Sequence, residues 1–209
     1  KRVSFNSIVG ERTAANGFYT AEEYVSGDLV TGIGGGVCQA SSTIYMAALT
    51  SNLKINDRKP HSDPVSYLTC GQDATVYWMG SRRIDFAFTN TSGGNLYITA
   101  HVEKLKNNTY QCVVRMYGLS LGEGVSYQLD TRTIETLTAP VNAEYVKDKN
   151  HEYVTYTDEE KLVRKARDGF VNETYLQRWE NGNLVSETLV SRDTSQARAA
   201  KYSVGTVAR

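Results

Sequence analysis

The residues most able to do chemistry in this sequence are a cysteine and the three glycines in front of it. Gly34, Gly35 and Gly36 stand in a row, and Val37 and Cys38 follow directly. Glycine lets the backbone turn through positive φ angles and approach a ligand closely. We therefore expect Gly35 and Gly36 to border a bound substrate, with the Cys38 thiol beside it.

The stretch after the cysteine has the pattern of a helix. Gln39–Leu49 contains no glycine or proline, and Ile44, Ala47 and Ala48 are spaced for one helix face. A thiol at a helix N-terminus feels the positive end of the helix dipole, which favours the thiolate and lowers its pKa by about a unit or more. This placement suits a nucleophile, and the amides of Cys38 and Gln39 are candidate oxyanion donors.

A cysteine nucleophile also needs a base, and the sequence holds three histidines. His61 lies in a turn, His101 lies in an alternating strand, and His151 lies in the second half of the chain. The residues alone do not decide among the three histidines.

Other interpretations of the cysteine stay open at this stage. A lone cysteine often packs as a small hydrophobe, and a glycine run before a helix can cradle phosphate. The spacing of Cys38, His61 and Cys70 fits no common zinc site, and a CxxC pair is absent. Three cysteines cannot all pair with one another, and we expect Cys70 and Cys112 to be structural thiols. No motif for a metal or a bound cofactor is apparent.

Composition narrows the class of protein. The 209 residues carry 23 basic and 23 acidic side chains, with 40% hydrophobic and 22% charged residues, as in ordinary globular proteins. A neutral chain without a basic block argues against nucleic-acid binding, and no apolar run is long enough to span a membrane. The chain begins Lys-Arg-Val, so we expect a fragment whose membrane attachment, if any, lies in a missing region.

Hydrophobic patterning predicts two domains. Residues 1–121 have the pattern of an α+β domain, with one helix followed by an antiparallel sheet. The predicted strands of this part are Ser4–Val9, Ala74–Trp78, Ile84–Phe88, Leu96–Val102 and Gln111–Tyr117, and Thr20–Glu23 is predicted to form one helical turn. Residues 122–209 are expected to form a small all-β module. In this part Glu180–Asn183 is a hairpin signal, and Asp158–Ala166 is predicted to be a helical or loop insertion.

The motif around Cys38 closely resembles the signature of the VanW domain family, named from vancomycin-resistance clusters. The resemblance covers about residues 3–118 and rests on these segments: Ser4–Asn6, Val9–Thr13, Gly34–Gln39, Ser41–Tyr45, His61–Ser62, Pro64–Val65, Gly71–Val76 and Asp85–Phe86. Residues 122–209 resemble the G-five β module of Gram-positive surface proteins, on the basis of Asp168-Gly169, Asn181-Gly182 and Gly205-Thr206.

The family resemblance implies a cell-wall protein of the bacterial surface, extracellular or anchored to the membrane. Some VanW domains are regarded as L,D-transpeptidases that form 3-3 cross-links in peptidoglycan through a cysteine thioester. The partners would be a donor tetrapeptide stem and an acceptor amine. Two alternatives stay open: a cysteine hydrolase of stem peptides, and a non-catalytic protein that binds peptidoglycan.

The resemblance also guides the choice of the remaining site residues. It makes His61 the expected general base. We expect Asp73, in the family-like Gly-Gln-Asp-Ala-Thr run, to orient His61, although Asp63 is closer in sequence and a turn cap is an equally good role for Asp73. Further expected substrate contacts are Gln39, Ser41, Ser42, Tyr45, Trp78 and Arg82, with Arg12 and Arg83 as weaker candidates.

Overall fold

The computed structural model describes the backbone of residues 1–25 and 28–209. Side chains are described for residues 1–23 and 31–209. Its longest helix, α2 (Val37–Thr50), begins after Gly36, which has a left-handed φ of 86°. The helix predicted from Cys38 onward is confirmed, with an extra residue at each end. Its buried face is Ser41, Ser42, Tyr45, Ala48 and Leu49. This face is rotated from the predicted stripe, because two buried serines replace apolar residues.

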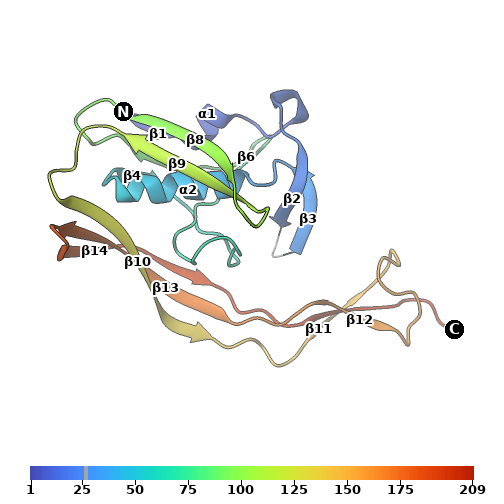
Figure 1. Cartoon of the computed structure of the whole chain (residues 1–209). Coiled ribbons are helices and arrows are strands. Elements are labelled where there is room, and N and C mark those ends of the chain that lie inside the picture. Colours follow the sequence, from blue (N-terminus) through green and yellow to red (C-terminus); the bar gives the residue numbers. More distant parts are fainter. Residues whose placement is uncertain (26–27) are drawn as a thin grey trace. The chain divides into compact units, whose positions relative to one another are not determined.

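Short antiparallel sheets surround this helix (Figure 1). A three-stranded sheet has the order β1 (Arg2–Ser4), β7 (Ala87–Thr89) and β4 (Lys54–Asp57). Three hairpins pair β2 (Thr20–Val25) with β3 (Asp28–Ile33), β5 (Tyr77–Met79) with β6 (Arg82–Ile84), and β8 (Tyr97–Lys104) with β9 (Tyr110–Tyr117). Helix α2 packs against β4 and β9, so its N-terminus is fixed by the core.

Aromatic side chains fill the core beside α2. The Tyr45 and Phe86 rings meet edge to face with centroids 5.7 Å apart, and Phe86 stacks on Phe88 at 5.9 Å. The other members of this cluster are Phe5, Ala48, Leu49, Leu53, Ala74 and Val76. Burial of these rings supplies the rigidity on which the site depends.

The family-like Ser4–Asn6 and Asp85 segments have a structural role. The Ser4 hydroxyl donates to Asp85 Oδ2 at 2.5 Å, and the backbone N–H of Asn6 donates to Asp85 Oδ1 at 2.9 Å. Ser4 also caps the short helix α1 (Phe5–Val9). The prediction of a strand over Ser4–Val9 is therefore wrong beyond Ser4, because capping favours the helix.

The C-terminal part is built from strands. One sheet has the order β10 (Val125–Leu137), β13 (Gly169–Glu180) and β14 (Asn183–Ser195), and another has β11 (Glu144–Lys147), β15 (Lys201–Val204) and β12 (Glu160–Arg164). Strand β15 is parallel to β11 and antiparallel to β12. Asn181 and Gly182 join β13 to β14 with φ angles of 49° and 80°, as the hairpin signal predicted.

Three local predictions are corrected by the structure. Thr20–Glu23 forms part of strand β2 rather than a helical turn, because pairing with β3 overrides its weak helical pattern. Asp158–Ala166 contains strand β12 rather than a helix, since it pairs with β15. The predicted strand Ala74–Trp78 begins only at Tyr77, and Ile84–Phe88 is divided between β6 and β7.

The chain is mostly β, so the α+β description is confirmed only in part, by α2. Two compact units are present, one of residues 1–132 and 172–193, the other of 133–171 and 194–209. The expected domain boundary between residues 121 and 122 stays a prediction. Among the described helices, none has the length and apolar character needed to cross a membrane.

Candidate active site

Cys38 is the second residue of α2, directly after the glycine turn. Its side chain is half-buried, and Sγ lies 3.3 Å from the carbonyl oxygen of Val76. The side chain of His61 is close enough to this thiol to lower its pKa. The sulfur therefore lies at a helix N-terminus and beside an imidazole, although Cys38 and His61 are 23 positions apart in the sequence.

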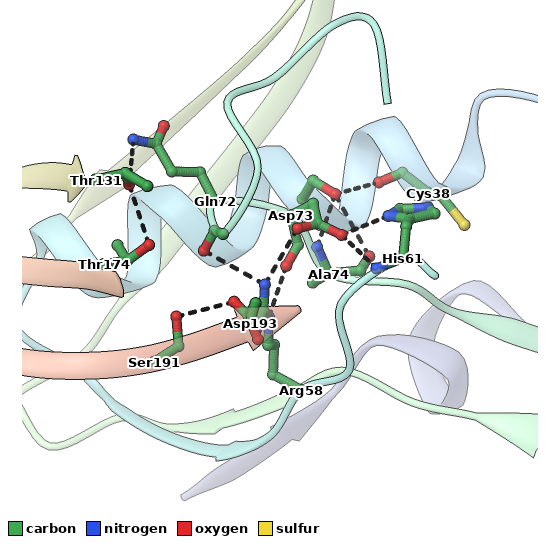
Figure 2. Close-up of polar contacts among 12 residues, drawn as sticks. Cys38, Arg58, His61, Gln72, Asp73, Ala74, Thr131, Thr174, Ser191 and Asp193 are labelled. Carbon is green, nitrogen blue, oxygen red and sulfur yellow. Dashed lines mark hydrogen bonds and ion pairs between the residues drawn. The ribbon is translucent and has the colours of Figure 1, made fainter. Parts of the chain in front are cut away.

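One carboxylate oxygen of Asp73 accepts two hydrogen bonds from His61. Asp73 Oδ2 accepts the backbone N–H of His61 at 2.6 Å and lies 2.6 Å from Nδ1 of the ring. Figure 2 shows the imidazole of His61 between Cys38 and Asp73. The structure thus brings together the three residues predicted as catalytic, and their catalytic roles remain a proposal.

The electrostatics of the three groups favour a charged pair. Burial lowers the pKa of His61, but hydrogen bonds to Asp73 and Cys38 outweigh burial and raise this pKa to about 9. Burial raises the pKa of Cys38, but the hydrogen bond to His61 and the nearby charges bring it below its usual value. Burial likewise raises the pKa of Asp73, but the bonds to His61 and the charge of Arg58 outweigh burial and bring this pKa below its usual value. The lowered pKa of Cys38 and the raised pKa of His61 favour transfer of the thiol proton to the imidazole.

Two residues that sequence reasoning missed complete this network. Arg58 donates from Nη2 to Asp73 Oδ1 at 3.1 Å and from Nε to the Asp73 carbonyl at 2.7 Å. Its Nη1 lies 2.6 Å from both carboxylate oxygens of Asp193 on β14. A basic residue three positions before His61 was the only available signal for Arg58, and Asp193 had none.

Arg12 shares a backbone partner with Cys38. It is buried, and its Nη2 donates to the Val76 carbonyl oxygen at 2.6 Å. The same oxygen is the partner of Cys38 Sγ. Burial raises the pKa of Cys38, and among the influences that lower this pKa the positive charge of Arg12 comes after the contacts with His61 and Val76. Arg12 was predicted only as a weak substrate contact.

Ser41 and Ser42 are fully buried and join α2 to the segment after Asp73. The Ser41 hydroxyl donates to the Ala74 carbonyl at 2.6 Å, and Ser42 Oγ accepts the Ala74 amide at 2.9 Å. Ser42 also donates to the Cys38 carbonyl at 2.7 Å. These bonds connect the start of α2 at Cys38 to the segment after Asp73, and the expected substrate contacts of both serines stay predictions.

The glycines before the helix differ from one another. A Cβ atom at Gly35 would lie 2.5 Å from the Glu22 carbonyl oxygen, so Gly35 is needed for close backbone packing. A Cβ at Gly36 would meet no atom within 4 Å, and its φ of 86° turns the chain into the helix. The predicted contact of a substrate with Gly36 is therefore not blocked by neighbouring atoms. Gln39, the other predicted contact at this point, is half-buried.

The other predicted contacts are spread over the same unit. Tyr45 belongs to the aromatic core and is 2% exposed. Trp78 is half-buried on β5, with the Arg83 guanidinium 4.0 Å from its ring centroid, and Arg82 is exposed on β6 above Tyr77. Their substrate contacts are proposals, and Tyr45 is the least accessible of them.

The remaining candidate groups lie elsewhere. His101 Nε2 lies 2.8 Å from Glu103 on the exposed hairpin, and His151 lies in the second unit. Within the described residues, Cys70 and Cys112 are not part of a disulfide. Within residues 1–25 and 28–209, no cluster of three or more histidine, cysteine or acidic side chains is arranged to hold a metal ion.

Comparison with known proteins divides the chain at a different place from the two compact units. Residues 1–113 match the family model described as VanW like protein, and residues 130–207 match the G5 domain model. The uncharacterized protein YoaR of Bacillus subtilis (strain 168) is 42% identical over 97 residues, which are 46% of this chain and 31% of YoaR. The chain therefore matches less than a third of that relative's length.

Two solved structures resemble the C-terminal part. The IgA1 protease G5 domain is 16% identical, covering 39% of this chain and 89% of that chain, with a TM-score of 0.24. The HP0197-G5 structure is 14% identical, covering 38% of this chain and 97% of that chain, with a TM-score of 0.18. Scores this low carry no argument about function.

Proposed function

Because the chain belongs to the VanW-like protein family, we propose that its first compact unit is a cysteine acyltransferase, an L,D-transpeptidase that forms 3-3 cross-links in peptidoglycan. The observation that carries this proposal is the bonded row of Cys38, His61 and Asp73 at the start of α2. An activated thiol with a base and an orienting carboxylate is the arrangement that acyl transfer through a thioester needs.

The first half of the reaction forms the thioester. The Cys38 thiolate attacks the carbonyl carbon of the third stem residue, a diaminopimelate, in a donor tetrapeptide. The oxyanion that forms is stabilised by the amides of Cys38 and Gln39 at the helix start. The amides of Val37 and Ala40 already donate to Gly34 and Gly36. The carbon–nitrogen bond then breaks, and protonated His61 gives its proton to the leaving D-Ala amine.

The second half transfers the acyl group. The side-chain amine of a diaminopimelate on a second stem attacks the thioester carbonyl, and neutral His61 takes the proton that this amine loses. The carbon–sulfur bond breaks, the thiolate returns, and an amide links the two stems. Asp73 stabilises the imidazolium in both halves, because its carboxylate accepts the ring N–H.

The C-terminal strands bear on where the reaction takes place. Residues 130–207 match a G5 domain, and the family resemblance places such modules on bacterial surface proteins. We propose an extracellular, cell-wall location, with stem peptides as the partners of the first unit.

Product analysis tests the proposal directly. The wild-type protein, incubated with purified disaccharide-tetrapeptide, is expected to give a cross-linked dimer and free D-Ala. Cys38→Ala is expected to give neither, whereas Cys112→Ala, which removes another free half-buried thiol, keeps the activity. Cleaved stem without dimer would identify a hydrolase, and an unchanged substrate in all samples would contradict an enzymatic role.

A further inference from the structure

Six charged groups of alternating sign run through the first unit. In order they are Arg12, Cys38, His61, Asp73, Arg58 and Asp193, and each interacts with the next by a hydrogen bond or through its charge. In the favoured ionisation states the row holds three positive and three negative charges. Buried charges are tolerated when they are paired in this way, and removal of one member leaves its neighbour uncompensated.

Asp193 is the last member of this row. Its side chain is 7% exposed and that of Arg58 is 8% exposed. Both Asp193 oxygens lie 2.6 Å from Arg58 Nη1, and Oδ2 also accepts the Ser191 hydroxyl at 3.1 Å. Two short contacts to one nitrogen, made away from solvent, constrain where the guanidinium can lie.

The position of Arg58 matters because the same guanidinium also contacts Asp73. Its Nη2 donates to Asp73 Oδ1, and the other oxygen of this carboxylate, Oδ2, holds His61. The guanidinium also lies over the Tyr45 ring, with 5.2 Å between its central carbon and the ring centroid. Arg58 can therefore orient Asp73 only while its guanidinium is itself held in place, by Asp193 at Nη1 and by the Tyr45 ring.

Strand β14 is bound to this unit by more than one residue. Val190 on β14 and Leu176 on β13 pack against the aromatic core, and residues 172–193 fall within the first compact unit. These residues belong to the region that matches the G5 domain. Residues 1–113, which match the VanW model, contain Arg58 but not its carboxylate partner.

We infer that Asp193 is a positioning residue for the cysteine site: strand β14, within the G5-matching region, holds Arg58 in place so that Asp73 can orient His61. This inference rests on the proposed function of Cys38 and His61. It means that the C-terminal region takes part in building the catalytic machinery, in addition to any attachment to the wall.

The test measures the ionisation of Cys38, which needs no substrate. The rate of Cys38 alkylation by iodoacetamide is followed against pH in the full chain, and the mass of the Cys38-containing peptide after digestion separates it from alkylation of Cys70 and Cys112. Asp193→Asn is expected to raise the midpoint of this profile by about one pH unit and to slow alkylation at pH 7 about tenfold. Without Asp193 the guanidinium of Arg58 is no longer held in place, so Asp73 orients His61 less well and the imidazolium stabilises the Cys38 thiolate less.

Glu187→Gln is the matched control, because Glu187 lies on the same strand and pairs with an arginine, Arg132, at an exposed position. This control is expected to keep the wild-type profile, and Asp193→Glu is expected to recover part of the loss. A folded Asp193→Asn protein with the wild-type profile would overturn the inference.

If Asp193→Asn does not fold, Ser191→Ala carries the test, since it removes one hydrogen bond from Asp193. A smaller shift in the same direction supports the inference, and an unchanged profile overturns it. An ordinary thiol profile in the wild-type protein would instead contradict the proposed function itself, so the two failures can be told apart.

Discussion

Two buried aspartates, one in each compact unit, are kept ionised by different partners. Asp73 in the first unit is bonded to side chains that carry charge, His61 and Arg58. Asp148 in the second unit accepts the backbone N–H groups of Tyr153 at 2.7 Å, Val154 at 3.0 Å and Glu152 at 3.0 Å. These bonds, with that of Tyr153 the strongest, lower the pKa of Asp148 to about 2.

The difference separates a reactive site from a structural one. Backbone amides cannot gain or lose a proton near neutral pH. The bonds of Asp148 therefore serve only to hold the loop of residues 148–154 in shape. His61 can exchange its proton, and its bond to Asp73 therefore links a buried carboxylate to the Cys38 thiol. A buried carboxylate indicates chemistry only when its partner titrates.

The largest expected effect comes from removing the arginine that holds Asp73, and the comparison is with an exposed arginine of the same unit. Arg58→Met leaves the buried carboxylates of Asp73 and Asp193 without their cation, and we expect a loss of about 3–5 kcal/mol in the free energy of unfolding. Arg132→Met is the control, because Arg132 also pairs with two carboxylates but is 46% exposed. Urea unfolding of both variants should show little change for Arg132→Met, and equal losses would break the comparison.

A smaller difference is expected from two buried serines. Ser42→Ala leaves the buried amide of Ala74 unpaired, at a cost of about 1–3 kcal/mol in the free energy of unfolding. Ser195→Ala in the second unit loses a weaker bond, 3.4 Å long, to the Phe170 carbonyl, and we expect about 0.5–1.5 kcal/mol. Thermal or urea unfolding measures both values, and the reverse order would contradict this ranking.

Because His61 titrates, the free energy of unfolding of the first unit is expected to depend on pH. In Cys38→Ala the bond to Asp73 still keeps the folded pKa of His61 above its ordinary 6.5, and in the intact site it is about 9. The folded state then binds the extra proton, so this stabilisation is complete below pH 6.5 and is lost as pH rises toward 9. Urea unfolding across this range should show the loss in Cys38→Ala and no such loss in Cys38→Ala with His61→Gln.

The smallest expected effect at neutral pH concerns Asp148, and it has the opposite sign. Its folded pKa of about 2 lies below the ordinary value of 3.8. Its stabilisation is therefore present above pH 3.8 and lost as pH falls through about 2. Asp148→Asn should remove this part of the acid dependence, measured by unfolding between pH 2 and pH 5. An identical acid profile in the variant would show that backbone amides do not hold this carboxylate.

The sequence alone predicted the local parts of the site well. The glycines and the uninterrupted run after Cys38 indicated a helix that begins at the thiol, because turn and helix signals act over a few residues. The neighbourhood of His61 and Asp73 came from a family resemblance. No local pattern could pair Arg58 with Asp193, since these residues are 135 positions apart and meet only through packing of β14.

Burial of polar residues was the other gap. Ser41 and Ser42 were expected to contact a substrate, with local capping of the first helical turn as the alternative. In the fold they replace apolar residues on the buried face of α2, where the backbone around Ala74 satisfies them. Only the path of the 73–76 segment explains this, and that path is set by contacts distant in sequence.

The double hold of Asp73 on His61 has a further consequence for the direction of proton movement. One carboxylate oxygen binds both the main chain and Nδ1 of the same residue, so a 180° flip of the ring would break a bond that the backbone keeps in place. The imidazole is thereby confined to a single tautomer when neutral, with its hydrogen on Nδ1 and its lone pair on Nε2. Every proton that enters or leaves the ring must then pass through Nε2.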